Sequence, residues 1–172
     1  MIFDLDEYED IVIENEDLSC IDLSGKIFTS CVFKDCRFNN VKIENLRFDR
    51  IVFDNCQIMG IDFSNLNSFF TSFNFLNCNI KHCIFSDMKL DNMSFERSVV
   101  HECDFYKSSL KNVNFSLCDL QGSTFDKNDL SSSNFEKSVN YNLNPTKNII
   151  KSAKFNYPEV LSLLNSFKIK IS

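Results

Sequence analysis

Cysteine is the residue type with the clearest capacity for metal or redox chemistry in this 172-residue sequence, because the chain carries eight. Zinc-binding cysteines usually come in pairs separated by about two to four residues. All but Cys20 instead follow spacings of five residues or its multiples within each half of the chain: Cys31, Cys36, Cys56, Cys78, Cys83, Cys103 and Cys118. This regularity indicates thiols that pack as small hydrophobic side chains in a core.

The two histidines, His82 and His101, lie close to Glu102 and form the one other group that resembles a metal or acid–base site. We expect both imidazoles to point outward as solvated surface side chains. The sequence contains no Gly-rich phosphate loop, nucleophile elbow or HExxH pair. We therefore expect no bound metal, no cofactor and no enzymatic activity.

A period of five residues organises the chain and must position all of these side chains. Neither a helix, with a period of about 3.6, nor a strand, with a period of 2, produces this pattern. Every fifth residue is large and apolar from Leu23 to Phe63, and the register then slips by two residues within 64–69. It resumes at Phe70 and continues through Phe75, Phe85, Phe95, Phe105, Phe115, Phe125 and Phe135.

A second column lies two residues before each large residue and holds mostly small or slender side chains, including the seven cysteines. The remaining three positions of each five are mostly Asn, Asp, Ser, Lys, Arg and Glu. One large and one small inward residue per five, with polar residues outside, predicts a coil that turns a corner every five residues.

Segments such as Cys-Arg-Phe-Asn-Asn (36–40) and Cys-Asp-Phe-Tyr-Lys (103–107) resemble the pentapeptide-repeat family, over about residues 13–139. The resemblance implies an all-β fold, a right-handed quadrilateral parallel β-helix with four repeats per coil. One departure is the small inward residue, which is often Ala in the family and largely Cys or Ser here. Residues 20 apart should then stack at about the strand spacing of 4.8 Å.

The four-sided coil predicts a core built from stacked columns. We expect two Phe columns on opposite faces, one with Phe75, Phe95 and Phe115 and one with Phe85, Phe105 and Phe125. We expect Cys36 to lie near Cys56 and Cys83 near Cys103, although a reducing compartment would keep these thiols free. The two-residue slip is interpreted as a bulge or corner loop that leaves the columns continuous.

We divide the chain into three regions: an acidic N-terminal cap with the first coil (1–22), the β-helix (23–139) and a C-terminal cap (140–172). Pro158 is predicted to start a helix, and Lys168–Ile171 alternates like a short strand. Residues 145–171 resemble the C-terminal module of the Qnr-type branch, the topoisomerase-protecting proteins of the family. That resemblance implies a homodimer, the alternative being a monomeric cap, and we assign its interface to Val160, Leu161, Leu164 and Phe167.

The charge distribution bears on the partner. The net charge is −6, with nine acids and no base in residues 1–22, but six lysines and only Glu159 in residues 137–172. The acidic start of the sequence lacks the pattern of a secretory signal, and no apolar run is long enough for a membrane span. We therefore expect a cytoplasmic protein that binds neither membranes nor, for want of a basic stripe, nucleic acid directly.

Three function classes remain. The Qnr-type resemblance implies binding to DNA gyrase or topoisomerase IV by mimicry of duplex DNA, which gives quinolone protection. An unrelated protein partner for a structural or interaction rod is the alternative. A metal or redox function of the cysteines or of the histidine pair has least support. Acids gathered on one face of the rod would favour DNA mimicry.

Overall fold

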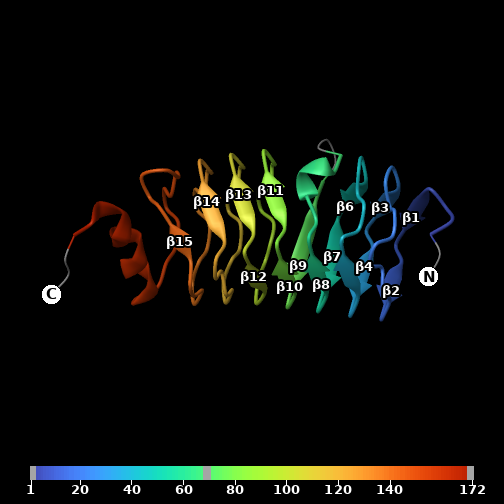
Figure 1. Ribbon diagram of the computed structural model, residues 1–172, viewed down its shortest axis with the longest axis horizontal. Coiled ribbons are helices and arrows are strands. Elements are labelled where there is room, and N and C mark those ends of the chain that lie inside the picture. Colours follow the sequence, from blue (N-terminus) through green and yellow to red (C-terminus); the bar gives the residue numbers. More distant parts are fainter. Residues whose placement is uncertain (1–2, 68–70, 170–172) are drawn as a thin grey trace.

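The computed structural model describes residues 3–67 and 71–169 and forms a parallel β-solenoid (Figure 1). The coils follow one another along a rod, and the N- and C-terminal ends lie at its opposite tips. Strands of successive coils pair in parallel with a register of 20 residues, as in Phe85↔Phe105 and Phe105↔Phe125. The parallel β-helix that the family resemblance implied is confirmed.

The strands are short and form four sheets that run along the rod. The sheets have the orders β1-β3-β6, β2-β4-β7-β9, β5-β8-β10-β12 and β11-β13-β14-β15. The strand bounds are β1 (Glu7–Glu9), β2 (Val12–Glu14), β3 (Ile27–Thr29), β4 (Val32–Lys34), β5 (Arg37–Asn39), β6 (Arg47–Asp49), β7 (Ile51–Asp54), β8 (Gln57–Met59), β9 (Phe73–Leu76), β10 (Asn79–Lys81), β11 (Ile84–Ser86), β12 (Val99–His101), β13 (Asp104–Tyr106), β14 (Thr124–Asp126) and β15 (Asn142–Leu143).

The corners explain why the strands are only three or four residues long over most of the rod. A residue with positive φ recurs every five positions, for example Asn40 (φ 52°), Asn45 (φ 56°) and Asn55 (φ 53°). Asn and Asp tolerate this left-handed conformation because their short side chains hydrogen-bond the local backbone. Each such residue turns the chain by one side of the square, and Cys20 (φ 61°) is itself a corner residue, which accounts for its exposure.

The core is filled by stacked aromatic rings. Phe95 and Phe115 stack with their centroids 5.0 Å apart, and Phe85 and Phe105 stack at 4.9 Å. The two columns meet edge to face across the rod, with Phe95 and Phe105 5.7 Å apart at an interplanar angle of 78°. Both arrangements are favourable for aromatic pairs. All of the ring side chains named here are fully buried.

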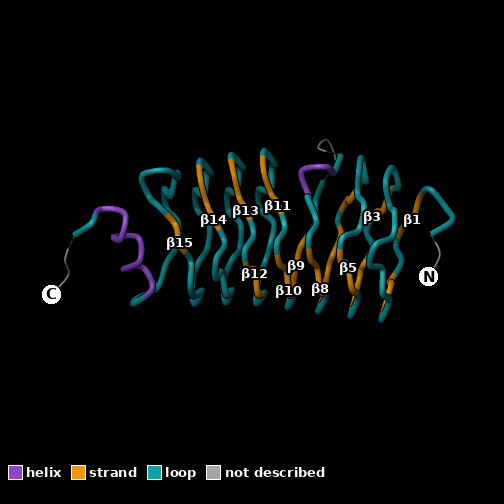
Figure 2. Tube along the Cα trace, viewed as in Figure 1, coloured by secondary structure: helices purple, strands orange, loops and turns teal. Residues whose placement is uncertain are grey.

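The register slip is absorbed at one corner, so the columns continue through it. The pairing interval changes from 20 to 22 residues, as in Phe53↔Phe75 and Ile58↔Ile80. A short 3₁₀ helix, η1 (Phe63–Asn65), begins the longer corner (Figure 2). The Asp62 carboxylate accepts from the Ser64 backbone N–H at 3.0 Å. Phe70, predicted to resume the register, lies outside the described residues.

The C-terminal end is closed by a second 3₁₀ helix, η3 (Glu159–Phe167), which follows Pro158 and packs against β15. Leu163 is the residue of this helix that is buried in the core, at 8% exposure. Lys168 ends the helix in a left-handed conformation with φ 53°. The strand predicted from Lys168 is therefore absent at 168–169, because a left-handed residue breaks the extended backbone, and residues 170–171 lie outside the described part.

Candidate protein-binding surfaces

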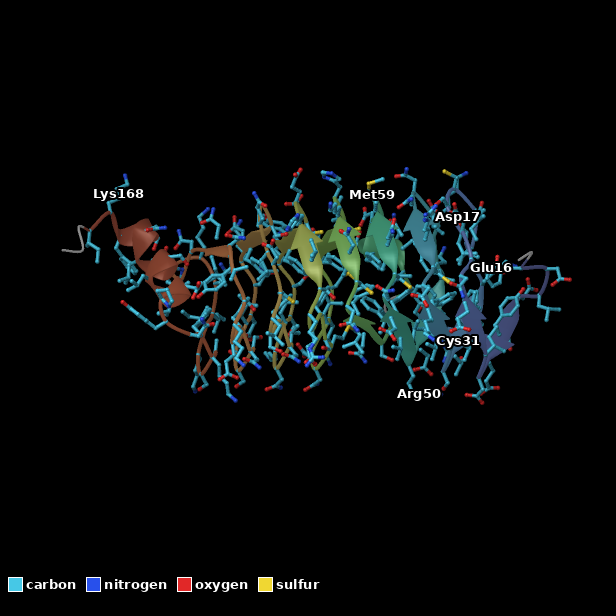
Figure 3. The ribbon with its side chains drawn as sticks, turned by 90° about the horizontal axis from the view of Figure 1, so that it is seen from below. Glu16, Asp17, Cys31, Arg50, Met59 and Lys168 are labelled. Carbon is cyan, nitrogen blue, oxygen red and sulfur yellow. The ribbon has the colours of Figure 1, made fainter. Side chains whose placement is uncertain are left out.

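The N-terminal half of the rod, residues 3–67, carries 14 acids and 6 bases, a net charge of −8. We call this region the acidic half. Residues 71–169 carry 10 acids and 11 bases. Glu16 and Asp17 lie toward the N-terminal end, whereas Lys168 lies at the other tip (Figure 3). The charge asymmetry of the sequence is thus an asymmetry along the rod.

The acids of the first coil point to every side of the acidic half. Glu7 and Glu9 flank the middle residue of β1, and Glu14 ends β2, so these carboxylates face outward from two different sheets. Asp22 lies on a third side, where its carboxylate accepts from the Ser24 backbone N–H at 2.9 Å. Hydrogen bonding to Ser24 lowers the pKa of Asp22, and Ser19 does the same for the pKa of Asp17.

Acids and bases are interleaved in the other half. Asp104 and Asp126 lie on one sheet face, and Lys107 and Lys127 directly follow their strands at the adjoining corner. The acids of the C-terminal half are therefore not gathered on a face of their own. A single acidic face along the whole rod, which would favour DNA mimicry over its entire length, is not formed by the described residues, and the acidic surface is confined to the first coils.

The seven cysteines of the inward column are buried, and all eight thiols are free. Each buried Sγ lies close to backbone carbonyls: Cys103 donates to the His101 oxygen at 3.3 Å, and Cys118 to the Phe95 oxygen at 2.8 Å. Burial raises the pKa of Cys118 to about 12. Cys36 lies beside Cys56, and Cys83 lies beside Cys103. Within each pair, the two thiols are close enough to shift one another's pKa.

The histidines lie on adjacent coils, each beside a carboxylate. His82 Nδ1 is 3.3 Å from Glu102 Oε2, and His101 Nε2 is 3.0 Å from Asp119 Oδ2. His82 is exposed, and His101 is half-buried. Within residues 3–67 and 71–169, no three His, Cys, Asp or Glu side chains converge on a point that could hold a metal ion.

The four residues assigned to a dimer interface all lie on η3. Leu161 and Phe167 are 37% and 51% exposed, whereas Leu164 and Val160 are half-buried, Val160 against the core of its own chain. Tyr157, just before the helix, is 79% exposed. Three large apolar side chains of the C-terminal tip, Tyr157, Leu161 and Phe167, are therefore exposed, and we refer to them together as the apolar patch.

The family model described as a pentapeptide repeat region matches residues 66–135. None of the curated proteins searched matches the sequence. Among solved structures, a trypsin-treated variant of QnrB1, a plasmid-mediated fluoroquinolone resistance protein, shares 14% identity with a TM-score of 0.71, covering 96% of this chain and 100% of that one. A second trypsin-treated variant of QnrB1 shares 16% identity with a TM-score of 0.68, covering 96% of this chain and 91% of that one.

The family model thus identifies a pentapeptide repeat region in residues 66–135, and the period of five and the parallel β-solenoid continue on both sides of it. The fold of this chain is the one that QnrB1 adopts, over nearly the whole of both chains. No helix in the described ranges is both long and apolar enough to cross a membrane.

Proposed function

We propose that this chain is a non-enzymatic binding protein whose acidic half occupies the DNA-binding surface of a type II topoisomerase, DNA gyrase or topoisomerase IV. Occupying that surface in place of DNA would protect the enzyme from quinolones. The observation that carries the proposal is the charge density of the acidic half. Its three coils extend about 14 Å along the rod, over which duplex DNA would carry roughly eight negative charges, and the net charge of residues 3–67 is −8.

The fold supports the same proposal in a coarser way. QnrB1 is a fluoroquinolone resistance protein, and its trypsin-treated variant shares this solenoid over the whole of that chain. A rod filled with side chains offers little of the enclosed space that small-molecule catalysis needs, whereas its sides offer long, regular surfaces. A proteinaceous partner with a basic, DNA-sized groove is complementary to such an acidic rod in shape and in charge.

We further propose that two chains associate through the apolar patch of Tyr157, Leu161 and Phe167. Large exposed apolar side chains near one another mark protein interfaces. A dimer built at this tip places the two acidic halves at its outer ends, away from the lysines of the C-terminal caps. Each acidic half would then remain free to meet the topoisomerase.

The test is DNA supercoiling by gyrase, with and without a quinolone, as the purified protein is titrated. We expect inhibition or quinolone protection at micromolar protein, and its loss in the variant Glu7→Gln, Glu9→Gln, Glu44→Gln. The matched control, Glu96→Gln, Glu102→Gln, Glu136→Gln, removes three carboxylates from the other half and should retain the effect. Absence of any effect on gyrase and on topoisomerase IV would reject the proposal.

The second candidate is a structural or interaction rod with an unrelated protein partner. The near-neutral outer surface of residues 71–169, rich in Asn and Ser, favours this function. If neither topoisomerase responds, affinity capture with the wild type and the triple Glu7/Glu9/Glu44 variant in parallel would show whether the acidic half selects the partner.

A further inference from the structure

A surface groove lies on the half of the rod away from the acidic half, on the outer side of the sheet β11-β13-β14-β15. Its volume is about 710 Å³, within the range of sites that hold small molecules. The strands of this sheet are adjacent in Figure 1. The groove therefore runs along the rod, across four successive coils, and is separate from the surface proposed to meet a topoisomerase.

The solenoid repeats the same pair of outward positions in the groove once per coil. In each of the three-residue strands β11, β13 and β14, the middle residue is a buried Phe, and its two neighbours face outward. One wall is formed by Ile84, Asp104, Thr124 and Asn142, and the other by Ser86, Tyr106, Asp126 and Asn144. Equivalent groups thus recur about every 4.8 Å along the groove.

The carboxylates of the groove leave acceptor capacity unused. Asp104 Oδ1 accepts from the Thr124 hydroxyl at 2.6 Å. Asp126 Oδ2 is 3.6 Å from Lys147 Nζ, but Oδ1 of the same group is buried and has no hydrogen-bond partner among the described residues. Leaving a buried acceptor unpaired is unfavourable. This oxygen is covered by the protein itself, so a ligand in the groove would meet Asp126 through Oδ2, and it would meet the exposed Asp104 carboxylate directly.

The charges around the groove are mixed. Lys147 lines it, and Lys107 and Lys127 lie over the Tyr106 ring at 5.0 and 5.3 Å, with Lys127 Nζ 3.2 Å from the Tyr106 hydroxyl. The two carboxylates in the walls would repel a polyanion, and the three lysines at the rim would repel a polycation. A neutral ligand that both donates and accepts hydrogen bonds fits this lining best.

We propose that this groove binds a neutral linear oligosaccharide. Sugar hydroxyls would donate to Asp104 and to Oδ2 of Asp126, and would accept from Lys147 and from the amides of Asn142 and Asn144. The Tyr106 hydroxyl, which accepts from Lys127 Nζ at 3.2 Å, would donate its own proton to a sugar oxygen. One hexose unit is close in length to one coil, so successive sugars meet equivalent pairs of side chains.

The experiment is a titration of the full-length protein with cellohexaose and maltohexaose, which are neutral hexose chains of β and α linkage, followed by NMR chemical shifts and calorimetry. We expect saturable binding of one of them with a Kd of about 1 mM or tighter. Asp126→Ala and Tyr106→Ala should each weaken binding by about ten-fold or more. The control Gln57→Ala, Lys81→Ala, on β8 and β10 of a different sheet, should bind like the wild type.

Three outcomes overturn the inference. The first is that neither oligosaccharide binds at about ten times the expected Kd. The second is that the sugar binds but Asp126→Ala and Tyr106→Ala leave the affinity unchanged, which would locate binding elsewhere. The third is that heptalysine binds the groove and the sugars do not, which would make it a site for basic peptides. Thermal unfolding of both single variants establishes that lost binding is not lost folding.

Discussion

Phe105 and Phe125 are 20 residues apart in the chain, and their rings stack in parallel with centroids 4.8 Å apart and an interplanar angle of 0°. The same interval separates their paired backbones in β13 and β14. Ring stacking and strand pairing therefore share one repeat distance. The core and the sheet stabilise the same register, because a shift of one coil by a single residue would break both.

Replacing Phe105 with Ala should lower the free energy of unfolding by about 3–5 kcal/mol. The side chain is fully buried and contacts rings above, below and across the core. Denaturant unfolding measures the loss. Ile84→Ala, at a neighbouring position that is 37% exposed, is the control and should cost under about 1 kcal/mol. A loss that small at Phe105 would contradict its inward packing.

Replacing the buried Asn128 with Ala should lower the free energy of unfolding by about 1–3 kcal/mol. The Asn128 side chain accepts from the Ser108 backbone N–H at 2.9 Å and donates to the Phe105 carbonyl at 2.8 Å, and both contacts are buried. Removing it leaves a buried donor and a buried acceptor unpaired. Gln121→Ala, which removes an exposed amide at a position without left-handed backbone, should change the unfolding midpoint little, and equal effects would contradict this account.

Thiol labelling of the native protein with DTNB should modify Cys20 rapidly and the other seven cysteines only after unfolding. Reaction requires the thiolate, and burial holds the pKa of Cys118 at about 12. Raising the pH to about 9 should therefore not expose Cys118 to the reagent while the fold persists. Rapid reaction of more than one thiol in the native state would show that the inward column is accessible.

Acidification should destabilise the first coil. The folded-state pKa values of Asp17 and Asp22 lie below the ordinary 3.8, through hydrogen bonds from Ser19 and Ser24. Their contribution is thus complete above pH 3.8 and is lost as the pH falls through the lowered values. The melting temperature should fall between about pH 5 and pH 2, and less in Asp17→Asn, Asp22→Asn. An unchanged pH profile in that variant would assign the effect to other groups.

Replacing Leu161 and Phe167 together with Asp should give a monomer if the apolar patch joins two chains. Two carboxylates in the interface would have to be buried unpaired. Light scattering or sedimentation measures the mass in solution. Leu5→Asp, Val12→Asp, which changes two exposed apolar residues at the other tip, should leave the dimer intact. A wild type that is already monomeric would reject the interface.

The period of five was enough to predict a coil that turns a corner every five residues, and the resemblance to the pentapeptide-repeat family added the β-helix and the columns that contain Phe85, Phe105 and Phe125. The reason is local: each corner depends on one left-handed residue and each side on a few neighbours, so the repeat closes without long-range choices. The burial of the cysteine column follows from the same rule. The sequence also predicted that the slip after Phe63 would leave the columns continuous, which the Phe53↔Phe75 pairing shows.

Two features were decided only by the tertiary structure. One is the side of the rod on which each polar residue lies, and the other is the packing at the two tips. Leu163 rather than Leu161 enters the core because the C-terminal helix is a 3₁₀ helix docked on β15, so the spacing of its apolar residues did not define the buried side. The sequence already indicated that the acids gather toward one end, but only the structure showed that they are not gathered on one face, because the acids of the first coil lie on several sides of the rod. The groove between Asp104 and Asp126 likewise exists only where paired strands bring residues 20 apart together.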